Sequence, residues 1–156
     1  MLKKRWRVKN MKHWKTRLLL LTGGIFVFTY AYAAERDITV PRVPPDQMEA
    51  AKVMKNPLQA TPDNIAKGKA IFEGKGTCFT CHGLSGKGDG DAGKALDPTP
   101  RNFTNSQFHS LRTDGEMFWV IKNGSAGTGM IAYNPAMIND DEAWQVILYE
   151  RSFKGK

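Results

Sequence analysis

Two cysteines and a histidine stand within five consecutive residues, Cys78-Phe79-Thr80-Cys81-His82. One turn of backbone over this spacing places the two thiols where they can add to the two vinyl groups of one haem. The adjacent imidazole is then brought beneath the iron and can bind it through its distal ring nitrogen. The C-x-x-C-H pattern therefore predicts one covalently attached haem c, held by Cys78 and Cys81, with His82 as an iron ligand.

Other uses of the two cysteines fit the sequence less well. A thioredoxin-like disulfide needs a βαβ pattern, and no convincing strand signal is present. A structural zinc site needs four ligands, and the chain has only 2 cysteines and 3 histidines, one of them close to the N-terminus. A plain disulfide across so small a loop would add little stability. Haem attachment is the preferred interpretation, and these three readings remain its alternatives.

Three short helices are predicted to position this motif. The first follows the capping pair Thr61-Pro62, and the second and third begin with capping boxes, in which a Thr or Asn is followed three residues later by Glu. Long Gly- and Pro-rich stretches separate them, so three helices alone bury little apolar surface. The macrocycle would supply the missing centre of the core. The predicted helices run from Pro62 to Gly74, from Thr113 to Asn123, and from about Asp140 to Phe153.

The formal charge of +8 belongs to the N-terminal end of the chain. Eight cations precede Leu18 with no acid among them, and the remainder of the chain carries 15 basic and 15 acidic residues, which argues against nucleic-acid binding. An uncharged run from Leu18 to Ala34 follows and contains the cleavage-like pattern Ala31-Tyr32-Ala33. The cations are Lys3, Lys4, Arg5, Arg7, Lys9, Lys12, Lys15 and Arg17.

Residues 1–34 are therefore predicted to be an export signal or, as the alternative, an uncleaved membrane anchor through Leu18 to Ala34. Either form would carry the rest of the chain to the periplasm or the outer face of the inner membrane. Residues 35–62 are rich in proline and are predicted to be a linking arm with one short helix between Asp46 and Lys55. Residues 63–156 form the predicted haem domain.

The segment from about Ile65 to Phe153 resembles the class I, monohaem bacterial cytochromes c. The matching pieces are Gly68-x-x-x-Phe72, the C-x-x-C-H motif, the run from Gly124 to Met130 and the run from Trp144 to Tyr149. The resemblance implies an all-α fold of about three to five short helices packed around one haem. It also implies that the first and last helices cross at Gly68.

The resemblance places the second iron ligand at Met130, in the loop before the last helix. A thioether is a soft ligand that favours ferrous iron and raises the reduction potential. Met137 and His109 are the alternatives, while Met117 is expected to be a core residue. The family often has proline directly after this ligand, and Ile131 stands there instead, so a less rigid loop is expected.

Three further roles follow from the same resemblance. A proline carbonyl is expected to accept a hydrogen bond from the second nitrogen of His82, and Pro98 is the better match in Asp97-Pro98-Thr99-Pro100. Arg101 is expected at a haem propionate. Trp119 is either a second propionate donor or, as the preferred reading, a core residue.

A G-x-G-x-x-G pattern from Gly88 to Gly93 matches a dinucleotide-binding fingerprint only superficially. No strand is predicted before it, and Asp89 and Asp91 would repel a pyrophosphate. We expect a flexible turn that leads the chain around the haem edge.

The sequence thus predicts a periplasmic one-electron carrier and not an enzyme, with periplasmic or membrane redox proteins as donor and acceptor. Two alternatives remain. One is a tethered haem c subunit of a larger membrane oxidoreductase, and the other is a haem enzyme or sensor with an open axial site.

Overall fold

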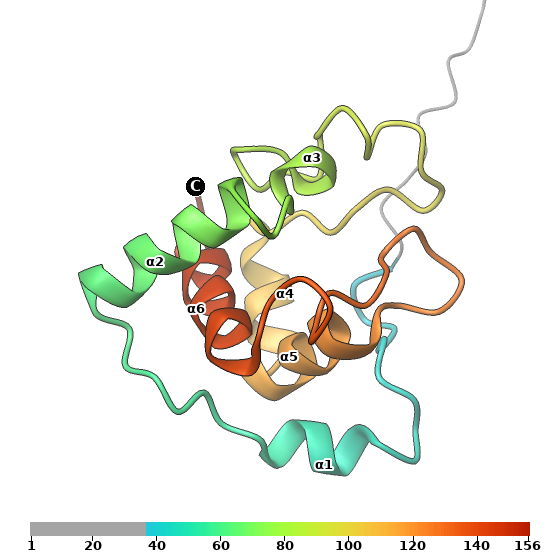
Figure 1. Ribbon diagram of the computed structural model, residues 1–156. Coiled ribbons are helices and arrows are strands. Elements are labelled where there is room, and N and C mark those ends of the chain that lie inside the picture. The colour runs from blue at the N-terminus through green and yellow to red at the C-terminus, as the bar shows by residue number, and fades with distance from the viewer. Residues whose placement is uncertain (1–36) are drawn as a thin grey trace, which may run out of the picture. The chain divides into compact units, whose positions relative to one another are not determined.

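A computed structural model of the chain describes residues 37–156, which form an all-helical unit (Figure 1). The predicted all-α class is confirmed, and no strand occurs between residues 37 and 156. The predicted leader lies outside the described residues. Within the described part, no helix is both long and apolar enough to cross a membrane. The helices are α1 (Met48–Val53), α2 (Pro62–Glu73), α3 (Phe79–His82), α4 (Ser106–Leu111), α5 (Asp114–Asn123) and α6 (Asp140–Arg151).

The three predicted helix starts are confirmed with the capping groups that the sequence indicated. The Thr61 hydroxyl accepts a hydrogen bond from the backbone N–H of Asn64 at the start of α2. Both later helices begin with a complete capping box, formed by Thr113 and Glu116 in α5 and by Asn139 and Glu142 in α6. These side chains satisfy backbone donors that a helix N-terminus leaves unpaired.

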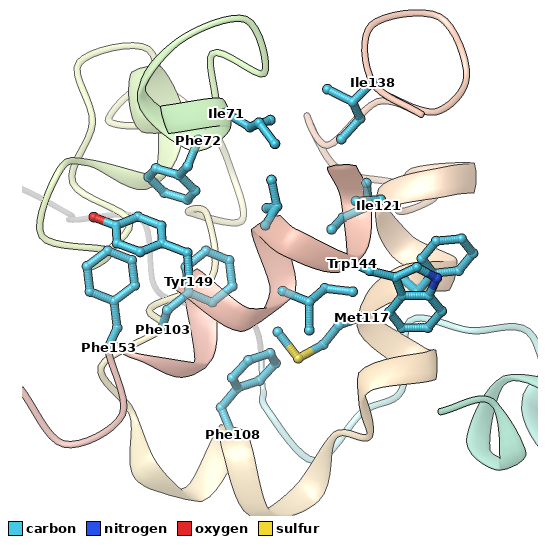
Figure 2. Packing of buried hydrophobic residues seen from close by; sticks show 14 residues of the cluster. Ile71, Phe72, Phe103, Phe108, Met117, Ile121, Ile138, Trp144, Tyr149 and Phe153 are labelled. Carbon is cyan, nitrogen blue, oxygen red and sulfur yellow. The ribbon is translucent and has the colours of Figure 1, made fainter. Parts of the chain in front are cut away.

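Helices α2 and α6 cross closely at Gly68, as Figure 1 shows for the green and red helices. A Cβ atom at Gly68 would lie 2.0 Å from the backbone oxygen of Gln145 and 3.1 Å from the Cβ of Tyr149. Next to this crossing, Phe72 is fully buried and its ring meets that of Tyr149 edge to face, with centroids 5.3 Å apart (Figure 2). The absence of a side chain at Gly68 therefore sets the distance between the two helices.

Replacing Gly68 with valine is expected to destabilise the domain, because the new side chain meets backbone that cannot move aside. Overpacking of this kind costs roughly 1–3 kcal/mol, and more where the obstacle is main chain. Urea unfolding of the haem-loaded protein would measure the loss. Ala66→Val adds bulk to an exposed position of the same helix and is the control. Equal unfolding midpoints for the two variants would contradict the close crossing.

Candidate cofactor site

An apolar cavity lies between α3, the segment after it, α5, α6 and the loop from Gly124 to Asn139. Its empty space is about 1200 Å³, including the opening to solvent. The structure brings all six predicted site residues to the wall of this cavity. They are Cys78, Cys81, His82, Pro98, Arg101 and Met130.

The C-x-x-C-H motif forms the single helical turn α3. The last carbonyls of a helix lack hydrogen-bond donors within the helix. The Gly-rich loop that follows α3 supplies these donors. The N–H groups of Gly88, Gly90 and Ala92 donate to the carbonyls of His82, Cys81 and Thr80 over 2.9, 3.1 and 2.9 Å. A Cβ at Gly90 would lie only 2.4 Å from the Thr80 oxygen. The loop therefore positions the motif, a role that the sequence analysis did not foresee.

His82 is buried and held in one orientation. Its Nδ1 donates a hydrogen bond to the carbonyl oxygen of Arg101 over 3.1 Å, and its ring stacks on Phe103 with centroids 4.6 Å apart. With the proton on Nδ1, the lone pair of Nε2 is available to a metal. Burial lowers the pKa of His82 to about 4; the nearby Arg101 charge also lowers it, while the hydrogen bond opposes the shift. The imidazole is therefore neutral at neutral pH, as a ligand must be.

The prediction that a proline carbonyl holds His82 is wrong, since the acceptor is Arg101 and neither Pro98 nor Pro100. Successive carbonyls of an extended chain point to opposite sides. The oxygen of Pro100 faces Gly88, where a Cβ would lie 2.4 Å from it. The next carbonyl, that of Arg101, consequently turns toward His82. Pro98 still lines the cavity.

The two cysteines are free thiols, and both line the cavity. Burial, and to a smaller extent the nearby Glu150 charge, raise the pKa of Cys78 to about 12. Thr77, directly before the motif, has a φ of 49°, which L side chains rarely adopt. Among residues 37–156, no group of three His, Cys, Asp or Glu side chains could hold a metal ion.

Met130 lies in a loop that is fixed by hydrogen bonds. Ser125 N–H donates to the Met130 carbonyl over 2.9 Å, and the Met130 N–H donates to the Thr128 hydroxyl over 3.1 Å. That hydroxyl in turn donates to the Ser125 carbonyl over 2.8 Å. Ile131, which stands where the family often has proline, is exposed. Hydrogen bonds thus restrain the loop where proline is missing.

The alternative ligands are less well placed than Met130. His109 Nε2 donates to the Phe103 carbonyl over 2.5 Å, and its Nδ1 lies 3.2 Å from a guanidinium nitrogen of Arg151. Both ring nitrogens of His109 are therefore committed to other partners. Met137 is 40% exposed and does not line the cavity. Met117 is buried in the core, as predicted, and its side chain also reaches the cavity wall.

Trp119 has neither of the roles predicted for it. It is half-buried, does not line the cavity, and lies outside the buried core. Its indole Nε1 donates to Oε1 of Gln47 over 2.6 Å. Trp119 therefore attaches the N-terminal arm to α5.

The residues around the cavity fit a haem. Two thiols, a neutral imidazole with an available Nε2 and a thioether share one largely apolar chamber with arginine side chains at its wall. Soft sulfur and imidazole ligands suit iron in a haem. Sequence reasoning found these groups but missed Phe103, the Arg101 carbonyl and the Gly-rich loop, which orient them.

The family model described as Cytochrome c matches residues 65–154. Among solved structures, a chain of the reducing HAO-like protein complex of Kuenenia stuttgartiensis is similar, with 31% identity and a TM-score of 0.56. That match covers 63% of this chain and 47% of the other, so this chain spans about half the length of that relative. Cytochrome cL of Methylophaga aminisulfidivorans aligns at 21% identity, with a TM-score of 0.46 and coverages of 61% and 59%. No curated protein matches the sequence.

Proposed function

Because this chain belongs to the cytochrome c family, whose members transfer electrons through haem, we propose that it is a periplasmic one-electron carrier with a single covalent haem c. Cys78 and Cys81 form the thioether bonds, and His82 and Met130 bind the iron. The observation that carries the proposal is the convergence of these four side chains on one cavity. Haem supplies an iron that cycles between the ferrous and ferric states.

The protein holds the proposed iron ligands in fixed positions and keeps substrates away from the iron. The hydrogen bond from His82 to the Arg101 carbonyl and the bonded loop around Met130 fix both ligands, so little needs to rearrange when an electron arrives. Met130 would supply a second protein ligand to the iron, and no position would then remain for substrates. This favours electron transfer over the alternative of a haem enzyme or sensor with an open site.

The proposal is tested on the full chain produced in a host that attaches haem c. We expect haem to stay with the polypeptide after denaturation, a spectrum of six-coordinate low-spin haem, and reversible one-electron titration. The reduced protein should not bind carbon monoxide readily at neutral pH. Ready carbon monoxide binding would favour a catalytic or sensing haem, and haem that separates on denaturation would refute covalent attachment.

A second candidate is a haem subunit of a larger membrane oxidoreductase. The similarity to a chain of a protein complex favours it, as does the predicted anchor through Leu18 to Ala34. The mature N-terminus separates the two candidates. A chain that begins near Ala34 by intact mass excludes a permanent transmembrane tether, whereas a retained leader supports it.

Because Glu150 is buried at the cavity wall, we expect the reduction potential to depend on pH. This α6 side chain is buried at the cavity wall; burial raises its pKa to about 8, with Arg151 opposing the shift and Asp114 adding to it. Below that pH the carboxyl is neutral, and above it the negative charge favours ferric iron. The potential should therefore fall between pH 7 and 9, on the order of tens of millivolts.

Potentiometry of Glu150→Gln should give a flat profile over the same range. Asp141→Asn removes an exposed acid from the same helix and should keep the wild-type profile. A wild-type potential that does not change between pH 7 and 9 would exclude Glu150 as the responsible group.

A further inference from the structure

Of the N-terminal arm, residues 37–56 pack on the haem domain and are not a free linker. Figure 1 shows α1 beside α5. A Cβ at Gly115 would lie 2.0 Å from the Ala51 carbonyl oxygen, so the two backbones touch there. At the far end of the arm, Asn56 donates a hydrogen bond to the Trp144 carbonyl over 3.1 Å. The arm precedes the residues matched by the family model, yet it belongs to the same folded unit.

One side chain of the arm reaches the haem cavity as a charged group. Arg42 lines the cavity wall, and its Nη1 donates to the Ser125 hydroxyl over 3.2 Å. The next residue, Val43, also lines the cavity and is 4% exposed. The arm therefore closes part of the chamber in which the haem would lie.

Arg112, a second cation of the cavity wall, already has partners within the protein. Arg112 Nη2 donates to the carbonyl of Ile38 over 2.6 Å, and its Nη1 lies 3.6 Å from Oε1 of Glu116. The second oxygen of that carboxylate accepts a bond from the Thr113 N–H. Oε1 of Glu116 is buried without a hydrogen-bond partner among the described residues. Arg112 is thus bound to the arm and to Glu116.

Haem carries two propionate groups that need cationic partners when they are buried. The planar fork of a guanidinium matches a carboxylate with two parallel hydrogen bonds. Three guanidinium groups line the cavity, against two carboxyl groups of the protein. The carboxyl groups are Glu116 and Glu150, and the guanidinium groups are Arg42, Arg101 and Arg112.

We propose that Arg42 binds a haem propionate, so that the N-terminal arm is part of the haem-binding site. This inference rests on the proposed function, because it requires a haem in the cavity. It extends the binding site beyond the family domain to a residue that precedes it. The arm then has two functions at this wall: it excludes water through Val43, and it neutralises one acid group of the cofactor.

The test compares Arg42→Gln with Arg42→Lys in the haem-loaded full chain. Loss of a positive charge beside the propionate favours ferric iron, so Arg42→Gln should lower the midpoint potential. It should also shift the carboxylate band of the propionate in the reduced-minus-oxidised infrared difference spectrum. Arg42→Lys keeps the charge and should retain most of the wild-type potential.

A control separates this role from a change of net charge. Lys52→Gln removes an exposed cation from α1 and lies away from the cavity lining. It should keep the wild-type potential and infrared band. The proposal is overturned if Arg42→Gln matches Lys52→Gln in both measurements. Wild-type protein without covalent haem would refute the proposed function instead, and this inference with it.

Discussion

Replacing both Cys78 and Cys81 with serine is expected to abolish covalent haem attachment and to prevent stable folding. The two thiols are the proposed points of attachment, and both line the cavity. Without the macrocycle, the apolar cavity whose lining includes Phe103, Met117 and Ile121 would be left unfilled. Haem staining of a denaturing gel measures attachment, and far-ultraviolet circular dichroism measures the retained helix. We expect loss of essentially all gel-stable haem.

The two single variants are expected to lose only part of the gel-stable haem. Cys78→Ser and Cys81→Ser each keep one thiol for a thioether bond, so each should keep some gel-stable haem. Ser85→Ala, in the exposed loop after the motif, should behave as wild type. A double variant that still carries haem through denaturation would show that other residues hold it.

Replacing Met130 with alanine is expected to change the midpoint reduction potential more than Glu150→Gln or Arg42→Gln does. Loss of the thioether would remove the proposed ligand, which favours ferrous iron, so the midpoint potential should fall by on the order of 100 mV or more. The sulfur-to-iron charge-transfer band in the near infrared should disappear. The reduced variant should also bind carbon monoxide, because one axial position is then open.

Met137→Ala is the matched control, since this methionine of the same loop is exposed and lies away from the cavity. It should retain both the band and the potential. If the band survives in Met130→Ala and is lost in Met137→Ala, the ligand assignment is reversed. Survival in both variants would exclude a methionine ligand in this loop and leave His109 to be examined.

Local signals in the sequence were sufficient for the long helices. The caps at Thr61, Thr113 and Asn139 all form as predicted, because a capping side chain and its backbone partner lie within three residues of each other. Helix α4 was missed. Its cap, Asn105, accepts bonds from Gln107 and Phe108, but six residues carry too little periodicity to be recognised.

Interactions between distant segments could not be predicted in the same way. The Arg101 carbonyl contacts His82 because the chain between them turns back across α3, and no pattern in the sequence records which carbonyl faces inward. The Gly-rich loop had a misleading motif, and its actual role depends on the close backbone approach at Gly90 and Gly93. Proline-rich composition predicts local extension and carries no information on docking, so the sequence predicts only a linker for the arm.

If Leu18 to Ala34 anchors the chain in a membrane, the docked arm would limit how far the proposed haem could travel from it. A fully extended segment from residue 35 to residue 62 would span roughly 90 Å. Close to the start of the described residues, the carbonyl of Ile38 already accepts a hydrogen bond from Arg112 of the domain. If Leu18 to Ala34 is retained as an anchor, only about three residues, or roughly 10 Å, separate it from the domain. A haem domain on so short a tether would exchange electrons close to the membrane surface.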